Sequence, residues 1–236
     1  MTEELFRADS YLKSCEAKVM AVDEVGIRLD RTVFYPEGGG QPGDSGTLST
    51  ADGRSIRITT TRKHPGTGGP SHVPEAGAPV LAVGDSVRAE IDWARRHAHM
   101  RMHSCLHLLC SLVEGAVTGG GLSETKGRLD FDLPGEVPNK ERLTAELNRL
   151  IREDHPVVPR WITDEELAAN PDLVRTMSVK PPTGSGRVRL LEIAGVDLQP
   201  CGGTHVARTG EIGAVVITKI ENKGRQNRRF NIAFAP

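Results

Sequence analysis

The stretch from Asp85 to Val113, DSVRAEIDWARRHAHMRMHSCLHLLCSLV, contains the point at which the pattern of the chain changes. Up to Trp93, apolar and charged residues alternate, which is typical of a strand with one buried face. Beyond Trp93, apolar residues recur at helical spacing, so one face of a helix over residues 94–113 can pack against a sheet. These apolar residues are Met102, Leu106, Leu109 and Val113. The sequence therefore predicts strands before this point and helices combined with strands after it.

Strands with glycine- and proline-rich connections are predicted for the first part of the chain. Candidate strands lie at residues 22–30, 54–60 and 85–93. Between them come PEGGGQPGDSG at residues 36–46 and HPGTGGPSHVPEAGAP at residues 64–79, which are typical of turns. Short strands joined in this way, without a helical period, predict a small antiparallel β-barrel over residues 1–92.

A second helix is predicted over residues 139–153. Asn139 is a candidate N-cap, and the pattern ends before Pro156. The apolar face of this helix consists of Leu143, Leu147, Leu150 and Ile151. Thr163 and Glu166 have the spacing of a capping box, which predicts a third, shorter helix.

The chain returns to a strand pattern near its C-terminus, where RRFNIAFA at residues 228–235 alternates between apolar and polar residues. The predicted fold class is α+β. The N-terminal barrel is followed, over residues 93–236, by a domain in which helices pack on an antiparallel sheet.

Composition limits the classes of function. The formal net charge is −1 and aromatic residues make up 4% of the 236 residues, so bulk charge and broad aromatic stacking are poor explanations for any nucleic-acid binding, while a local basic patch remains open. The four cysteines show no even framework, which favours reduced thiols and a cytoplasmic protein. No apolar run approaches about 20 residues and the N-terminus is acidic, so we expect neither a membrane span nor a secretion signal.

Two short motifs together predict a metal site. His103 and His107 are four residues apart on the first helix, which places both imidazoles on one face. Cys201 and His205, in CGGTHV, could supply the other half of a tetrahedral site. Three imidazoles and one thiolate suit Zn²⁺. His99 has the same spacing from His103 and is a competing ligand, and each motif alone is also compatible with a solvated helix face or a glycine turn.

The kind of metal site stays open at this point. Ser104 follows the first histidine, where a zincin has a glutamate base, which disfavours a metallopeptidase. Four protein ligands are typical of a closed, structural zinc, whereas catalysis needs an open position. The residues alone leave structural and catalytic zinc evenly matched.

Several dispersed segments resemble one known family. HSCLHLL at residues 103–109, followed by CGGTHV at residues 201–206, resembles the editing domain of alanyl-tRNA synthetase and its free-standing AlaX-type relatives. The threonyl-tRNA synthetase editing domain has a related histidine and cysteine set. FYPEGGGQPGDSG, at residues 34–46, is similar to the glycine-rich segment of these proteins. GRLDFDL at residues 127–133 and GEIGAVVITKIENKG at residues 210–224 also resemble family segments.

The resemblance runs from about residue 17 to the end of the chain and implies both the fold and the metal ligands. The fold would be a β-barrel followed by the α+β domain shared by alanyl- and threonyl-tRNA synthetases. The implied ligands of one Zn²⁺ per chain are His103, His107, Cys201 and His205, which leaves His99 outside the site. One departure concerns VTGGGL at residues 117–122, which has Gly121 where relatives often have a glutamine.

The resemblance also implies an enzyme, an aminoacyl-tRNA deacylase that acts in trans without a nucleotide cofactor. Its substrate would be tRNA(Ala) mischarged with serine or glycine, and the reaction would be hydrolysis of the aminoacyl ester. A synthetase pocket discriminates small side chains by only about 1–3 kcal/mol, which is why a second, hydrolytic sieve is needed. Zinc could activate water, polarise the ester carbonyl or hold the tRNA end.

Candidate catalytic and tRNA-contacting residues follow from the same segments. Asp130 and Asp132 share one strand face and are candidate catalytic carboxylates, although solvated or ion-paired carboxylates are the more common case. Gly38, Gly39 and Gly40 either let the backbone approach the substrate or form a hairpin turn. A candidate phosphate-binding cluster consists of Lys219, Lys223, Arg225, Arg228 and Arg229. Arg95, Arg96 and Arg101 could extend this cluster.

Two alternatives to an alanine-specific editing enzyme remain. One is a threonyl-type editing domain, which differs in the tRNA that it deacylates. The other is an RNA-binding module without hydrolase activity, in which zinc only joins the helix to the turn and supplies folding free energy.

Overall fold

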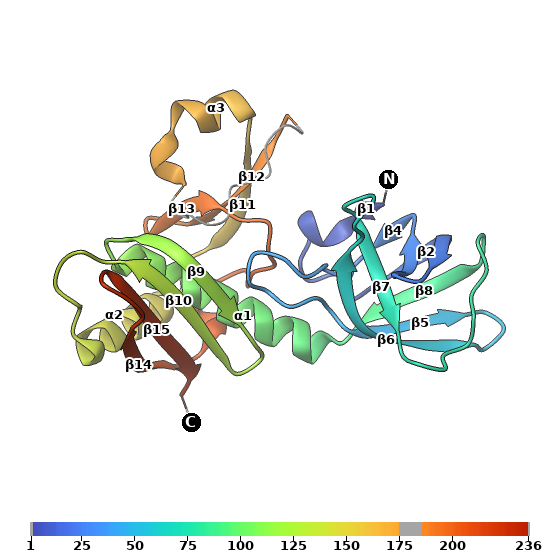
Figure 1. Cartoon of the computed structure of the whole chain (residues 1–236), viewed down its shortest axis with the longest axis horizontal. Coiled ribbons are helices and arrows are strands. Elements are labelled where there is room, and N and C mark those ends of the chain that lie inside the picture. Colours follow the sequence, from blue (N-terminus) through green and yellow to red (C-terminus); the bar gives the residue numbers. More distant parts are fainter. Residues whose placement is uncertain (1, 175–185, 236) are drawn as a thin grey trace. The chain divides into compact units, whose positions relative to one another are not determined.

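The computed structural model describes residues 2–174 and 186–235 of the chain. The chain divides into two compact units, Met1–Ala98 and His99–Pro236 (Figure 1). The division falls within helix α1 (Trp93–Leu112), whose first residues belong to the first unit and whose remaining residues belong to the second. Domain limits at 1–92 and 93–236 stay a prediction.

The first unit contains a closed β-barrel, as the sequence predicts. In barrel order, its strands are β2 (Ser14–Asp23), β3 (Gly26–Leu29), β7 (Pro70–Pro74), β6 (Ser55–Lys63), β5 (Gly46–Thr50) and β8 (Ser86–Ile91). The alternation that predicts β8 places Val87, Ala89 and Ile91 in the barrel core. A short 3₁₀ helix, η1 (Leu5–Arg7), follows β1 (Glu3–Glu4), which pairs in parallel with β4 (Arg31–Thr32).

Residues 22–30 form a hairpin, and the expectation of a single strand there is wrong. The Asp23 carboxylate accepts hydrogen bonds from the backbone N–H groups of Val25 and Gly26, which stabilises a turn. Gly26 has a φ of 141°, and a Cβ atom there would lie 2.5 Å from the carbonyl oxygen of His72. The chain therefore reverses between β2 and β3.

The glycine-rich segment is joined to the start of α1 by a buried ion pair. Arg96 and Asp44 are fully buried, and the Arg96 Nε lies 3.0 Å from the Asp44 Oδ2. The Arg96 guanidinium also donates to the carbonyl oxygens of Ser10 and Val33. Arg96 thus has a structural role within the first unit, and the expectation that it extends a phosphate-binding surface is wrong.

The second unit is built on an antiparallel sheet of four strands. In sheet order these are β14 (Val215–Asn222), β15 (Asn227–Phe234), β10 (Lys126–Asp132) and β9 (Ala116–Leu122). Helix α1 packs on β10 at Gly127, where a Cβ atom would lie 2.9 Å from the Met102 sulfur. The apolar positions predicted for α1, Met102, Leu106, Leu109 and Val113, are all buried.

Helix α2 (Lys140–Arg152) satisfies backbone groups of the edge strand β14. The Asn148 side chain binds both the N–H and the carbonyl oxygen of Val215, and Thr144 accepts from the N–H of Ile217. Asn139 caps α2 as predicted, with its side chain accepting from the N–H of Arg142. These contacts protect one edge of the sheet from pairing with another chain.

A second antiparallel sheet positions the segment that follows it. Its order is β11 (Val157–Ile162), β12 (Val188–Ile193) and β13 (Asp197–Pro200). Helix α3 (Asp164–Ala169) has the predicted capping box of Thr163 and Glu166, and Leu167 packs on this sheet. The described part of this unit also contains the 3₁₀ helices η2 (Pro171–Leu173) and η3 (Thr209–Ile212).

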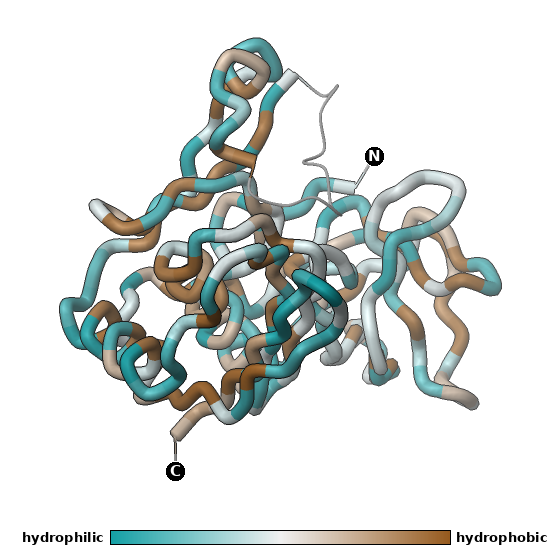
Figure 2. The backbone as a smooth tube through the Cα atoms, turned by 60° about the vertical axis from the view of Figure 1, so that its left-hand side comes forward, coloured by the Kyte–Doolittle hydropathy of each residue, from teal (hydrophilic) through white to brown (hydrophobic). Residues whose placement is uncertain are grey.

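The predicted α+β class is confirmed: one closed antiparallel barrel and two further antiparallel sheets occur with a small number of helices. Figure 2 shows hydrophilic and hydrophobic residues alternating along the tube, as expected for strands with one buried face. Among residues 2–174 and 186–235, no helix combines the length and the apolar character needed to cross a membrane.

Candidate metal centre

Helix α1 supplies two histidines to one site. His103 and His107 lie one helical turn apart, their ring centroids are 5.4 Å apart, and both residues are less than 10% exposed. The spacing of four residues places both rings on the same helix face. His99 is also buried but is not part of the ligand group.

The turn after β13 supplies a cysteine and a third histidine, and Arg189 holds this turn. The N–H of Cys201 donates to the carbonyl oxygen of Arg189 at 3.1 Å. In return, the Arg189 Nη1 donates to the carbonyl oxygens of Cys201 at 2.8 Å and Gly203 at 3.0 Å. The N–H of Gly203 lies 3.4 Å from the Cys201 Sγ. The turn is therefore fixed from the neighbouring strand.

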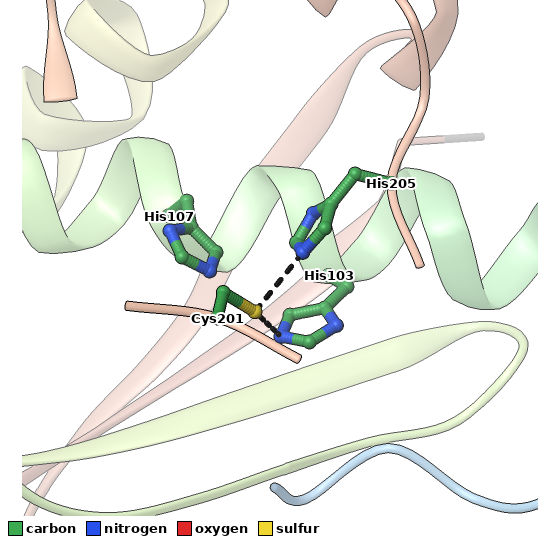
Figure 3. A group of neighbouring side chains, drawn as sticks. All are labelled: His103, His107, Cys201 and His205. Carbon is green, nitrogen blue, oxygen red and sulfur yellow. Dashed lines mark hydrogen bonds between the residues drawn. The ribbon is translucent and has the colours of Figure 1, made fainter. Parts of the chain in front are cut away.

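The helix and the turn bring four ligand atoms together (Figure 3). The Cys201 Sγ lies 3.1 Å from the His205 Nε2 and 3.7 Å from the His103 Nε2. One potential ligand atom from each of His103, His107, Cys201 and His205 lies within 4.8 Å of the other three. Within the described residues, this set of side chains could hold a metal ion, and its donor types are those predicted from the sequence.

Two further side chains contact the histidines on the side away from the sulfur. The Nδ1 of His107 lies 3.3 Å from the Oδ2 of Asp197, and the same oxygen accepts from the Gln199 Nε2 at 2.5 Å. The Nδ1 of His205 lies 3.1 Å from the Ser104 Oγ, which also accepts from the N–H of Val206 at 3.2 Å. All of these polar contacts are buried.

The similarity of this chain to known proteins covers nearly its whole length and not only the four candidate ligands. The chain is 40% identical to the "Alanyl-tRNA editing protein AlaX-M" of Methanosarcina acetivorans, over 98% of both chains. It is 35% identical to the protein of the same name from Saccharolobus solfataricus, over the full length of both. The chain belongs to the AlaX family of alanyl-tRNA editing proteins.

Parts of this chain also match families and proteins named as aminoacyl-tRNA synthetases. Residues 188–231 match the family described as "Threonyl and Alanyl tRNA synthetase second additional domain", and residues 6–95 match that described as "tRNA synthetases class II (A)". The "Alanine--tRNA ligase" of Saccharolobus islandicus is 34% identical over 93% of this chain, which spans 25% of that protein. The first of these matches contains two of the four ligands of this AlaX-family chain, Cys201 and His205.

The charges of the ligands are mutually dependent. Burial opposes ionisation of the Cys201 thiol, but the positive charge of the three imidazoles outweighs it and lowers the pKa of Cys201. Burial disfavours a protonated His107, but the Cys201 thiolate and Asp197 raise the pKa of His107 to about 9. For His205, burial together with the neighbouring imidazoles lowers the pKa. The lowered pKa of Cys201 favours the thiolate, and the thiolate is the form of cysteine that binds metals.

Of the two candidate catalytic carboxylates, Asp130 is engaged in ion pairs. It accepts from the Arg229 Nε at 2.7 Å and from the Arg128 Nη1 at 3.1 Å. Hydrogen bonding from Arg229 outweighs partial burial and lowers the pKa of Asp130. Asp132 is half-buried two residues along the same strand, and neither carboxylate belongs to the ligand group. A catalytic role for either residue stays a prediction.

The predicted phosphate-binding cluster lies on the β14–β15 hairpin and is partly neutralised. Glu221 pairs with Lys219 and Lys223. Hydrogen bonds from Asn231 and Lys219 lower the pKa of Glu221 to about 2, so it remains charged. Arg229 is bound to Asp130, and Arg228 donates to the Asn222 side chain and to backbone carbonyls. Arg225 is exposed at the turn.

The three consecutive glycines of the first unit form a hairpin turn. The N–H groups and carbonyl oxygens of Gly38 and Gln41 bind each other, and Gly39 and Gly40 have φ values of 58° and 80°. This is the turn that the sequence allowed. Substrate contact by Gly38, Gly39 and Gly40 stays a prediction.

Sequence reasoning missed the residues that surround the ligands. Asp197, Gln199 and Cys201 alternate in DLQPC, and the first two lie on one face of β13. That alternation was a usable signal. Arg189 could not be found in this way, because its contacts with the ligand turn arise from the pairing of β12 with β13.

Proposed function

We propose that this chain is an aminoacyl-tRNA deacylase that acts in trans on mischarged tRNA(Ala), with the seryl ester as its principal substrate and the glycyl ester as the second. Its full-length relatives are named alanyl-tRNA editing proteins. The chemical product of editing would be free amino acid and uncharged tRNA(Ala). Water provides the attacking oxygen, and the ribose hydroxyl is the leaving group.

The observation that carries this proposal is the four-ligand group in a chain that matches AlaX-M proteins from end to end. Its ligand atoms lie within 4.8 Å of one another, although they come from segments almost a hundred residues apart in the sequence. Three of the four ligands are buried and Cys201 is partly exposed. We infer that the aminoacyl end reaches the group from the side of Cys201.

The donor set fits zinc better than other common ions. A thiolate with three imidazoles is a soft to intermediate set, whereas Mg²⁺ and Ca²⁺ prefer oxygen ligands. His103, His107, Cys201 and His205 would hold the ion. Bound zinc would supply a Lewis acid next to the ester carbonyl.

Side chains of the protein determine the water access and the charge of the candidate zinc site. Buried His103 and His107 keep bulk water from the helix side of the group. The lowered pKa of Cys201 favours the thiolate, which is the form that binds a metal. Asp130 is paired with Arg229 in the sheet, and this pairing lowers its pKa. A catalytic role for Asp130 stays a prediction.

The test is to incubate the protein with tRNA(Ala) charged with serine, glycine or alanine and to follow loss of the ester. The proposal predicts rapid loss of the serine ester, loss of the glycine ester and protection of the alanine ester. Faster hydrolysis of the alanine ester than of the other two, or hydrolysis of none, would contradict it.

A second candidate function is editing of a threonyl tRNA. The description of the family matched by residues 188–231 names both threonyl and alanyl synthetases. The same assay with seryl-tRNA(Thr) separates the two, because a threonyl-type editor would deacylate that species in preference to seryl-tRNA(Ala).

A further inference from the structure

Asp197 lies behind His107 and is itself held in place. Its side chain is 1% exposed, and its Oδ2 lies 3.3 Å from the His107 Nδ1. The Gln199 Nε2 donates to the same oxygen. Because residues two apart on a strand share one face, β13 presents Asp197 and Gln199 together toward α1. The carboxylate therefore has a fixed direction.

Ser104 has the corresponding position behind His205. It is fully buried on α1, and its Oγ lies 3.1 Å from the His205 Nδ1. The same oxygen accepts from the N–H of Val206, so Ser104 contacts both the ring and the backbone of the ligand turn. Helix α1 thus supplies two ligands of its own and one residue that orients a ligand from the turn.

We propose that Asp197 and Ser104 are positioning residues of the metal centre, each of which binds the Nδ1 of one histidine ligand so that its Nε2 is directed at the metal position. This inference rests on the metal site of the proposed function. Neither residue belongs to the group of candidate ligands.

The chemistry of neutral imidazole supports these roles. A neutral ring has one N–H donor and one acceptor nitrogen. A carboxylate can only accept, so Asp197 selects the form of His107 with hydrogen on Nδ1 and a lone pair on Nε2. In Ser104, one lone pair accepts from the N–H of Val206. When the Nε2 of His205 binds a metal, the ring carries its hydrogen on Nδ1, and the second lone pair of the Ser104 Oγ can accept it. Such partners fix the orientation of the ring and raise its basicity as a ligand.

The test compares zinc affinity in two pairs of variants. Asp197→Asn keeps the shape of the side chain but removes its charge, and Glu153→Gln is its control, because Glu153 contacts His155 at 2.9 Å outside the ligand group. Ser104→Ala removes the hydroxyl, and Ser111→Ala is its control on the same helix, where Ser111 donates to the carbonyl oxygen of Leu108. Competition with a chelator gives the dissociation constant, and urea unfolding of the metal-free proteins reports folding.

We expect roughly 10- to 100-fold weaker zinc binding in Asp197→Asn and Ser104→Ala and unchanged binding in both controls. Ser104→Thr, which keeps the hydroxyl, should restore part of the affinity. Nitrogen NMR of the zinc-bound wild type should find hydrogen on Nδ1 of His107 and His205. Wild-type affinity in Asp197→Asn and Ser104→Ala, or hydrogen on Nε2 of either ring, would overturn the inference.

The same measurements separate this inference from the proposed function. If the wild type binds zinc and hydrolyses seryl-tRNA(Ala) but the variants match their controls, only the positioning roles fail. If the wild type binds no zinc, both the positioning roles and the zinc-dependent function fail.

Discussion

Arg189 binds two backbone groups of the ligand turn. It is buried, and its guanidinium donates to the carbonyl oxygens of Cys201 and Gly203. Arg189→Met would leave these two acceptors unpaired, at about 1–3 kcal/mol for each buried group. We expect lower unfolding free energy by urea and weaker zinc binding by chelator competition.

Arg160→Met is the matched control for this substitution. Arg160 lies on the adjacent strand β11, is 60% exposed and pairs with Glu192. An exposed ion pair of this kind contributes about 0–1 kcal/mol. Equal losses of stability and zinc affinity in the two variants would contradict the role given to Arg189.

His72 should make the barrel sensitive to acid. It is fully buried between Thr32 and the carbonyl oxygen of Ile27, and burial lowers the pKa of His72 to about 4. Between about pH 6.5 and pH 4 the unfolded chain binds a proton that the folded chain excludes, so stability falls as the pH falls through this window. The loss is on the order of 3 kcal/mol.

The pKa of His72 can be measured by NMR, and hydrogen exchange of barrel amides reports the stability change. We expect faster exchange at pH 5 than at pH 7 after correction for intrinsic rates, and a smaller change in His72→Gln. A His72 ring that titrates near pH 6.5 would show that it is not buried in neutral form.

Also at the residue scale, the grouping of the four candidate ligands was predictable from sequence, whereas most of the side chains around them were not. His103 and His107 follow helical spacing, and Cys201 and His205 flank two glycines, so each pair has a local pattern. The choice of His107 over His99 as the partner of His103 came from the resemblance. The contacts of Ser104 and Arg189 join segments far apart in sequence, which no local period encodes.

In the glycine-rich segment, Gly43 is needed for a close approach of two backbones, whereas Gly39 is needed for a positive φ. A Cβ atom on Gly43 would lie 1.9 Å from the carbonyl oxygen of Thr61, whereas none of the surrounding atoms lies within 4 Å of a Cβ on Gly39. Gly43→Ala should therefore displace β6 and lower the melting temperature markedly. Gly39→Ala strains only a φ of 58°, at roughly 1 kcal/mol. Equal melting temperatures would contradict the close approach at Gly43.

The basic residues of the β14–β15 hairpin should differ in their effect on the salt dependence of tRNA binding. Arg225 is exposed, whereas Arg229 is bound to Asp130. If Arg225 contacts a phosphate, Arg225→Ala should reduce the slope of log K against log salt for tRNA binding by about 0.7–0.9. Arg229→Met should leave the slope nearly unchanged. The measurement is filter binding of uncharged tRNA(Ala) across a salt series, and the reverse order of effects would contradict the pairing.

Helices and strands with a regular spacing of apolar residues were predictable from the sequence. The positions of turns between strands were less predictable. The alternation of β8 and the caps at Asn139 and Thr163 agree with the structure. The hairpin at Asp23 was missed, although the charged pair Asp23 and Glu24 interrupts the alternation between Val22 and Val25. Strand β11 has Pro159 in its interior, which a strand tolerates at the edge of a sheet.

For the molecule as a whole, the change of pattern at Trp93 was enough to predict the α+β class. A net charge of −1 gives no bulk attraction for RNA, so the proposed binding of tRNA would rest on local charged groups. The family was predictable because several separate segments resemble it, whereas the composition alone indicates only a globular protein.

Serine release from seryl-tRNA(Ala), measured while zinc is added back to metal-free protein, tests zinc-dependent editing most directly. Activity should be absent without metal, rise in proportion to zinc and level off near one zinc per chain, with alanyl-tRNA(Ala) left intact throughout. A full rate in the metal-free protein, or equal hydrolysis of the alanyl ester, would contradict it.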